Sequence, residues 1–225
     1  MKKDIEHIPL IYDKRKHARE FVLKVTLLES PIEVNRRISV PSTIRLCHLG
    51  PVILRAMGWV GYHKEEFECG HTTYAKKESV DYYEGWKAKD DDECYVDWAE
   101  VALGDVLKKK GDTMTYVYDL GDDWRHEVRL VETHRYPVGS CPDPYVISGK
   151  NSCPPDDVGG VYGYKRLLDI LANPEEDEEE YKSYKEWLPT GFDEHLFSVR
   201  DAELRMGDYL RAVRTAQQMM GDRYV

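Results

Sequence analysis

One histidine in the sequence combines an inward position with reactive chemistry. His126 follows a turn at residues 120–123 and lies on an expected strand, where alternation puts it on the same face as Trp124 and Val128. We therefore expect His126 to point inward. A buried imidazole needs a polar partner, since leaving its nitrogens unpaired costs about 1–3 kcal/mol. His126 is then either a core histidine bonded to a carboxylate or backbone carbonyl, or a pocket ligand or general base.

Aspartates cluster around the same turn and recur in a second segment. The turn region holds Asp119, Asp122 and Asp123, and residues 153–157, here called the CPPDD loop, add two carboxylates beside consecutive prolines. Hard oxygen ligands favour magnesium, calcium or manganese, whereas an added histidine (His126 or His63) or cysteine shifts the preference toward zinc or another transition metal. Ordinary turn chemistry explains the same aspartates without a metal. A divalent metal is one interpretation, and the cofactor stays open.

These residue types define two overlapping sets of candidates. The candidate metal ligands are Asp119, Asp122, His126, Cys153, Asp156 and Asp157, and the candidate catalytic residues are His126, Asp122 and Asp157. Consecutive prolines stiffen the chain, which suits carboxylates that must be held in place. We therefore expect Asp156 or Asp157 to lie near the hairpin turn, and close to His126 if all of them share a site.

Three familiar motifs do not fit. Cys141 and Cys153 are separated by eleven residues and belong to no CxxC pair, which disfavours a structural zinc site. The glycines of residues 159–163 lack the Lys-Ser/Thr ending of a phosphate-binding loop. His126 and Arg129 have the HxxR spacing of tyrosine recombinases, but a strand points them to opposite faces.

The composition indicates a folded protein with a real core. Of 225 residues 41% are hydrophobic, and sixteen Tyr, five Trp and four Phe are too many for a disordered chain. The net charge of -10 counts against broad nucleic-acid binding, so a protein partner or small ligand is favoured. The sequence has no apolar run that could span a membrane and no signal-peptide pattern, so we expect a cytoplasmic protein with reduced cysteines and no membrane partner.

Periodicity predicts the elements that would position these residues. Alternation of period two predicts strands at residues 20–28 and 36–40 and hairpins at 62–76 and 113–132. Helical spacing predicts helices that end at Gly58, that cover 164–172 and that cover 199–220. Residues 77–97 are expected to form an irregular, mobile loop, and 135–160 a long structured loop. The acids at 175–180 indicate a solvated first helical turn or, alternatively, an acidic protein-binding segment.

Several segments together resemble one family, the plasmid pRiA4b ORF-3-like proteins, some of which are labelled transposon passenger or resolvase-like. Residues 116–126 resemble its aromatic strand and GD-x-W-x-H turn, with Leu120 where Phe is usual. Residues 153–160 are similar to its CPPEDxGG segment, although Asp156 replaces Glu and Val158 stands where Cys is frequent. Residues 34–41 resemble its W-R-R-I element, with Asn35 in place of Trp, and residues 57–67 resemble its helix exit, including His63.

The resemblance implies an α+β fold built on a mainly antiparallel sheet, with packed helices and a helical C-terminal part. We expect a loose basic tail at residues 1–17, a pRiA4b ORF-3-like domain at 18–200 and a C-terminal helix at 201–225. The resemblance implies association with mobile genetic elements and no established activity. The resolvase label lacks support here, because Ser30, Ser39 and Ser42 lie at strand ends or a helix cap rather than in an arginine-rich catalytic domain.

Three hypotheses of function remain. The leading one is a binding domain associated with plasmids or mobile elements, with a concave site built by the hairpin and the CPPDD loop. Whether the protein is an enzyme stays open, and the first alternative is a metal-dependent enzyme acting on nucleic acid or phosphate esters, with His126 as base. The second is a DNA-binding accessory of recombination, whose basic face would use Lys2, Lys3, Lys14, Arg15, Lys16, Arg36 and Arg37.

Overall fold

The computed structural model describes residues 10–13, 17–87, 92–137 and 140–221. Its strands are β1 (Arg19–Leu27), β2 (Asn35–Pro41), β3 (Glu65–Cys69), β4 (Thr72–Ala75), β5 (Cys94–Asp97), β6 (Thr113–Tyr118), β7 (Trp124–Arg135) and β8 (Tyr145–Lys150). Its helices are α1 (Leu46–Met57), α2 (Lys77–Trp86), α3 (Leu103–Val106), α4 (Gly160–Ala172), α5 (Glu178–Trp187) and α6 (Val199–Gly221), with a 3₁₀ turn at Trp98–Glu100.

Over the described residues the strands form one sheet in the order β5-β4-β3-β6-β7-β1-β2-β8. The β4–β5 pair is parallel and the other pairs are antiparallel. The predicted α+β fold, with a mainly antiparallel sheet, packed helices and a helical C-terminal part, is confirmed. The hairpins predicted at 62–76 and 113–132 and the helix predicted at 199–220 are also present.

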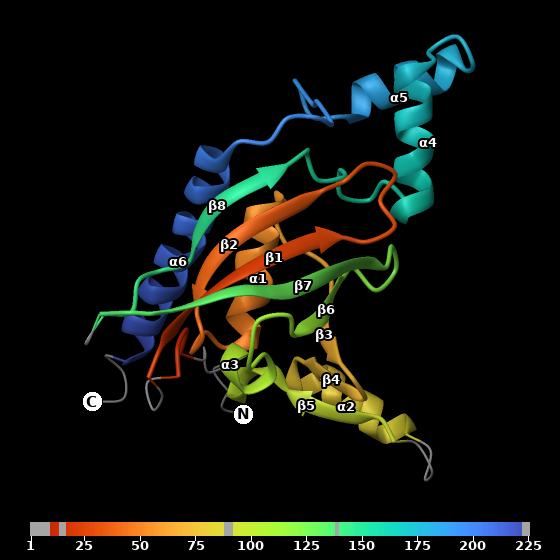
Figure 1. Ribbon diagram of the computed structural model, residues 1–225. Coiled ribbons are helices and arrows are strands. Elements are labelled where there is room, and N and C mark those ends of the chain that lie inside the picture. Colours follow the sequence, from red (N-terminus) through yellow and green to blue (C-terminus); the bar gives the residue numbers. More distant parts are fainter. Residues whose placement is uncertain (1–9, 14–16, 88–91, 138–139, 222–225) are drawn as a thin grey trace.

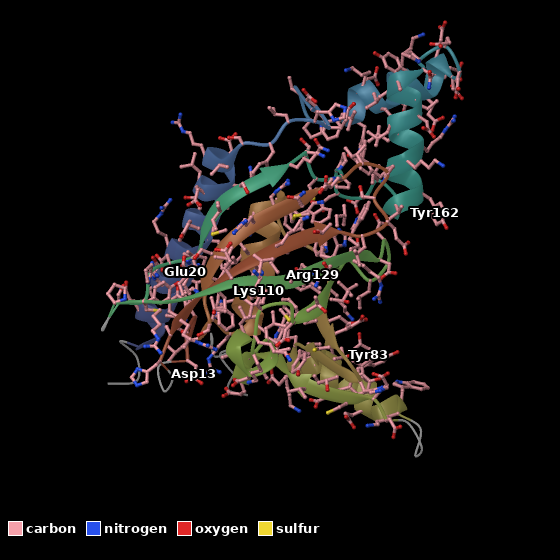
Figure 2. The ribbon with its side chains drawn as sticks, viewed as in Figure 1. Asp13, Glu20, Tyr83, Lys110, Arg129 and Tyr162 are labelled. Carbon is pink, nitrogen blue, oxygen red and sulfur yellow. The ribbon has the colours of Figure 1, made fainter. Side chains whose placement is uncertain are left out.

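One face of the sheet is covered by helices, and the other is open. In Figure 1, α1 and α6 lie side by side behind the sheet, and none of the described helices crosses the face toward the viewer. The sequence of β7 explains this arrangement, because buried Trp124 and His126 alternate with the more exposed Arg125 and Arg129. Arg129, labelled in Figure 2, lies on the open face and pairs with Glu127 at 2.6 Å. Charge pairs thus solvate one face while the opposite face forms the core.

α1 leads the chain from the sheet into the candidate site. Nine of its twelve residues are buried, and the helix ends where the Gly58 amide donates to the Leu54 carbonyl at 2.8 Å. This ending was predicted from the glycine after the last apolar position. The next residue, Trp59, is only 2% exposed and enters the core behind the hairpin.

The segment at 77–97 was wrongly predicted to be irregular. It contains α2 and β5, and residues 88–91 between them lie outside the described residues. Aromatic contacts anchor this segment: the Tyr83 hydroxyl donates to Glu66 Oε2 at 2.9 Å, and its ring lies 5.1 Å from that of Tyr95. These aromatic residues do not recur at a regular spacing, so the sequence shows no apolar period that would have predicted the helix or the strand.

Two further predictions need correction. Residues 135–160 include β8, an edge strand with mostly exposed side chains that therefore lacks an apolar period. Residues 10–13 and 17 are the described part of the predicted tail, and Ile11, at 4% exposure, belongs to the core. The Asp13 amide also donates to the Thr43 carbonyl at 2.8 Å. The expectation that this region stays outside the core is therefore wrong for residues 10–13.

The acidic run begins a helix, as the solvated-turn interpretation predicted. Asp177 caps α5 by accepting the Glu180 amide at 2.9 Å, and Glu178 to Glu180 occupy the first turn. Negative charge near a helix N-terminus is favourable because it faces the positive end of the helix dipole. None of the helices in the described ranges combines the length and apolarity needed to cross a bilayer.

Candidate functional site

An aromatic cluster joins the hairpin to the CPPDD loop. The Trp59 ring lies 5.1 Å from Tyr118, 5.7 Å from Trp124 and 5.5 Å from His126, the last in an edge-on arrangement. Its indole nitrogen donates to the Pro154 carbonyl at 2.9 Å. Trp59 therefore fixes the loop to the core through both packing and a buried hydrogen bond.

His126 lies inside this cluster. His126 and Trp124 are 0% and 1% exposed, which confirms their predicted burial. The Nδ1 atom of His126 lies 3.2 Å from the Tyr116 carbonyl, and Nε2 has no hydrogen-bond partner among the described residues. Burial lowers the pKa of His126 to about 4, so the ring is neutral at pH 7. This geometry corresponds to the core-histidine alternative with a carbonyl partner.

The hairpin lies beside the CPPDD loop, where Tyr118 contacts Asp156, as their chemistry predicted, and the chain just after the loop contacts the hairpin turn. The Gly159 amide donates to Asp122 Oδ2 at 3.2 Å. Gly160 has φ +67, and a Cβ there would lie 2.7 Å from the Asp122 carbonyl oxygen. Both conditions favour glycine, because the two backbones approach too closely for a side chain. Asp122 thus holds the two segments together, and its carboxylate faces a backbone amide.

A histidine and two aspartates gather where these segments meet. His63 Nδ1 lies 3.3 Å from Asp119 Oδ2, and Nε2 lies 3.4 Å from Asp157 Oδ1. One potential ligand atom from each residue lies within 4.8 Å of the others. We call His63, Asp119 and Asp157 the junction cluster. It is graded in exposure, since the side chain of Asp119 is 14% exposed and that of Asp157 is 75% exposed.

The backbone at both aspartates is unusual. Asp119 and Asp157 have φ values of +56 and +61, in the left-handed region that residues with a Cβ enter at some cost. Asp119 is held there by its own turn, since its Oδ1 accepts the Gly121 amide at 2.9 Å. The remaining carboxylate oxygen of Asp119 is the one that faces His63.

Neither Asp156 nor Cys153 belongs to the junction cluster, although Asp156 lies near its charged groups. The Tyr118 hydroxyl donates to Asp156 Oδ1 at 3.3 Å, and burial raises the pKa of this carboxyl, aided by the nearby charges of Asp157 and Asp119. Burial also raises the pKa of the Cys153 thiol, which disfavours a thiolate ligand. Of the six predicted metal ligands, the structure brings Asp119 and Asp157 together around a histidine.

A groove of about 480 Å³ is lined in part by the CPPDD loop. We call it the loop groove. The CPPDD loop, the end of α1 and residues 187–205 form its walls, and Arg36 and Arg205 place guanidinium groups there. Arg36 is 1% exposed, so the prediction that it belongs to a basic surface for DNA is wrong. Arg37, also part of that predicted face, pairs with Glu132. The other five residues of the face lie outside the described residues: Lys2, Lys3, Lys14, Arg15 and Lys16.

Sequence reasoning missed a further carboxyl near His63, that of the partly buried Glu65. Glu65 accepts a hydrogen bond from the buried Tyr116 hydroxyl, and burial raises the pKa of Glu65 to about 7. It lines a second pocket, of about 890 Å³, together with His63. A Cβ at Gly50 would lie 2.4 Å from Glu65 Oε2. The glycine inside the expected helix was the available signal of this close approach.

His63 was named only as an optional addition to a metal site. The sequence shows that His63 follows shortly after the end of the predicted helix at Gly58, but no periodicity relates it to residues 119 and 157. Tertiary structure alone brings it between the two aspartates.

A family model and two similar proteins relate this chain to known proteins. The family model described as plasmid pRiA4b ORF-3-like protein matches residues 19–201. A similar relative is "Uncharacterized protein y4hQ" of Sinorhizobium fredii (strain NBRC 101917 / NGR234), with 33% identity over 153 residues, 68% of this chain and 73% of the relative. A crystal structure described as a protein of unknown function, MM3350 from Methanosarcina mazei Go1, has a TM-score of 0.68 and 28% identity. That match covers 84% of this chain and 98% of the other.

Proposed function

Because this chain belongs to the plasmid pRiA4b ORF-3-like family, whose relatives described above carry no assigned activity, we propose its function from the geometry of the site. We propose that the protein is a binding domain and that its junction cluster binds a divalent cation through His63, Asp119 and Asp157. The observation that carries the proposal is that one donor atom from each of His63, Asp119 and Asp157, which come from separate segments of the chain, lies within 4.8 Å of the others.

The donor set supports a divalent cation. A neutral imidazole and two carboxylates carry a net charge of -2, which balances the +2 charge of the ion. Ligand atoms on one ion are separated by at most about twice the metal–ligand length, or roughly 4–5 Å, and the three donor atoms lie within 4.8 Å of one another. One nitrogen and two oxygens favour manganese, zinc or a similar ion over calcium, which prefers oxygen alone.

The rigidity of the junction also supports this function. The Asp122–Gly159 hydrogen bond, the consecutive prolines and the Trp59–Pro154 bond hold the ligand-bearing segments before any ligand arrives. Preorganisation of this kind raises affinity because less ordering occurs on binding. The positive φ angles of Asp119 and Asp157 are likewise a cost that a functional site explains.

Titration calorimetry with manganese, zinc and magnesium on tag-free, chelator-treated protein tests the proposal. We expect stoichiometric binding of at least one ion, and a loss of roughly tenfold or more in affinity for His63→Ala and for Asp157→Asn. His71→Ala is the matched control, because His71 is exposed in the β3–β4 turn, and it should bind as the wild type does. Absence of stoichiometric binding, or equal binding by His63→Ala, would refute the proposal.

The same three groups could instead form an ion-paired imidazolium without a metal, and proton release separates the two interpretations. A cation that binds the imidazole must displace its proton, so binding should weaken as the pH falls and should release protons in weakly acidic buffer. Calorimetry in two buffers of different ionisation enthalpy measures that release. If His63→Ala binds the ion with wild-type affinity and without proton release, the ion binds at another place in the protein.

A further inference from the structure

The loop groove contains two guanidinium groups that lack carboxylate partners. Among the described residues, neither Arg36 nor Arg205 lies within ion-pair distance of an acid, although Asp156 and Asp201 also line the groove. The described arginines on the open face differ, since Arg37, Arg125 and Arg129 all pair with glutamates. The lining thus holds two arginines and two aspartates, but among the described residues neither guanidinium is ion-paired, whereas these arginines of the open face are.

Arg36 is fixed in place by carbonyl groups. It donates to the carbonyls of Ala56, Asn35, Lys150 and Met57, at 2.7–3.0 Å. Its guanidinium also lies over the Phe197 ring, 3.9 Å from the centroid. Carbonyls orient the group but leave its charge in place, and a buried charge without a counterion is costly. Burial lowers the pKa of Arg36 only to about 10, so it stays charged at pH 7.

Within the described part of the chain, Arg205 has free hydrogen-bond donors, whereas those of Arg36 are largely bonded to carbonyls. Its Nε donates to the Arg55 carbonyl at 3.1 Å, which leaves its two terminal nitrogens without a partner among the described residues. A terminal guanidinium edge of this kind binds a carboxylate or phosphate through paired hydrogen bonds. Arg205 is on α6, whereas Arg36 is on β2, so the two charges reach the groove from different elements.

Aromatic side chains form the rest of the wall. Trp59, Trp187, Phe192 and Phe197 line the groove, and Trp187 is 45% exposed. The volume of about 480 Å³ lies within the roughly 300–1,000 Å³ usual for small-molecule sites. Rings beside fixed positive groups suit a ligand with a flat apolar body and an anionic end.

We propose that the loop groove binds a small organic anion, whose carboxylate or phosphate pairs with the free edge of Arg205 above Arg36 and whose flat apolar body packs against Trp187 and its aromatic neighbours. None of the three junction-cluster residues lines this groove, and its ligand class is independent of any metal.

Four phenyl compounds of different charge test the proposal, with chelator present so that the junction cluster plays no part. Phenylacetate and phenyl phosphate carry the anion, 2-phenylethanol is neutral and 2-phenylethylamine is cationic. We expect tryptophan fluorescence or calorimetry to detect at least one anion below about 10 mM, with the neutral and cationic compounds at least about tenfold weaker. Tighter binding of phenylacetate assigns a carboxylate ligand, and tighter binding of phenyl phosphate assigns a phosphate ester.

Variants on the same helix locate the anion. Arg205→Gln should weaken binding of the preferred anion at least about tenfold, while Arg205→Lys should retain part of it because the charge remains. Arg200→Gln is the matched control, since Arg200 is exposed on α6, and it should match the wild type. Trp187→Ala should weaken all phenyl probes, and Trp86→Ala, exposed on α2, should weaken none.

Three results would overturn the proposal. They are no detectable binding of either anion by the wild type, binding of the preferred anion that is no tighter than that of 2-phenylethanol, or unchanged anion affinity in Arg205→Gln with its fold intact by circular dichroism.

Discussion

The surroundings of His126 and of His63 use one residue type in opposite ways. His126 is fully buried, lies edge-on to Trp59 and has a backbone carbonyl beside it. His63 is partly exposed, lies 5.7 Å from the Tyr118 ring and has a carboxylate beside each ring nitrogen. The strand thus buries its histidine among aromatic rings, whereas the meeting of loops leaves a histidine partly exposed between two carboxylates. Trp59 contacts the His126 ring, Tyr118 contacts the His63 ring, and the two aromatic rings lie 5.1 Å apart, so they connect the two environments.

The largest expected effect comes from removing Trp59, which packs against His126 and bonds to the CPPDD loop. Trp59→Ala deletes a 2%-exposed side chain and its bond to the CPPDD loop, so we expect a loss of about 3–5 kcal/mol in the free energy of unfolding. Urea denaturation measures the loss. The matched variant Trp86→Ala removes an exposed ring and should cost less than about 0.5 kcal/mol. Similar losses in the two variants would mean that Trp59 does not join the two regions.

The pH dependence of stability should separate His126 from Glu65. The pKa of His126 is lowered from 6.5 to about 4, so between these values the unfolded chain binds the extra proton and stability rises with pH. The pKa of Glu65 is raised from 4.5 to about 7, so between these values the folded chain holds the extra proton and stability falls with pH. In the wild type the two contributions to the pH dependence of the unfolding free energy therefore oppose each other where the two pH ranges overlap.

Single substitutions should expose each slope. Glu65→Gln should leave a rise in unfolding free energy on the order of 3 kcal/mol between pH 4 and 6.5, and His126→Gln should leave a fall of similar size between pH 4.5 and 7. Denaturant titrations at each pH measure both. A wild-type slope retained in both variants would show that other groups control the pH dependence.

A smaller effect tests the close approach that forms the junction. Gly160→Ala puts a Cβ 2.7 Å from the Asp122 carbonyl oxygen, whereas Gly70→Ala, also at positive φ, meets nothing within 4 Å. Both variants carry the backbone penalty, so their difference isolates the contact. We expect Gly160→Ala to lower the unfolding free energy by about 1–3 kcal/mol more than Gly70→Ala, measured by thermal denaturation. Equal values would mean that the two loops can separate freely.

The smallest expected effect concerns His63 itself. Its carboxylate contacts are partly exposed, so His63→Ala in chelator-treated protein should change the unfolding free energy by less than about 1 kcal/mol. His126→Ala, which empties a fully buried position, should cost more than about 2 kcal/mol. A larger loss for His63→Ala than for His126→Ala would reverse the roles assigned to the two histidines.

Local chemistry predicted much of the fold and the general place of the site. Period-two alternation in residues 113–132 predicted the hairpin and the buried faces of Trp124 and His126, because strand geometry fixes which side chains share a face. Proline and aspartate chemistry predicted that the CPPDD loop lies beside the hairpin. The helix at 77–86 was missed because Tyr83 and Glu66 stabilise it through a contact that leaves no repeating pattern.

The identity of the partners could not be predicted in the same way. His126 was expected to need a carboxylate or a carbonyl, and the sequence could not decide between them because both lie within reach of a hairpin. His63, Asp119 and Asp157 come from three segments whose meeting depends on the whole sheet. Arg36 was assigned to a surface, yet its alternation with Asn35 and Arg37 in β2 places it on the core face beside Ile38.

The position of β1 in the sheet also has a consequence for biosynthesis. β1 pairs with β7 on one side, and their partners run from Arg19 with Arg135 to Leu27 with His126. A nascent chain therefore carries β1 with one open edge while roughly a hundred residues are still to be translated. Pairings of such long sequence separation form slowly, and open edges invite intermolecular pairing. We expect early folding to stop at the β1–β2 hairpin, so that ribosome-bound chains shorter than residue 135 depend on chaperones to stay unaggregated.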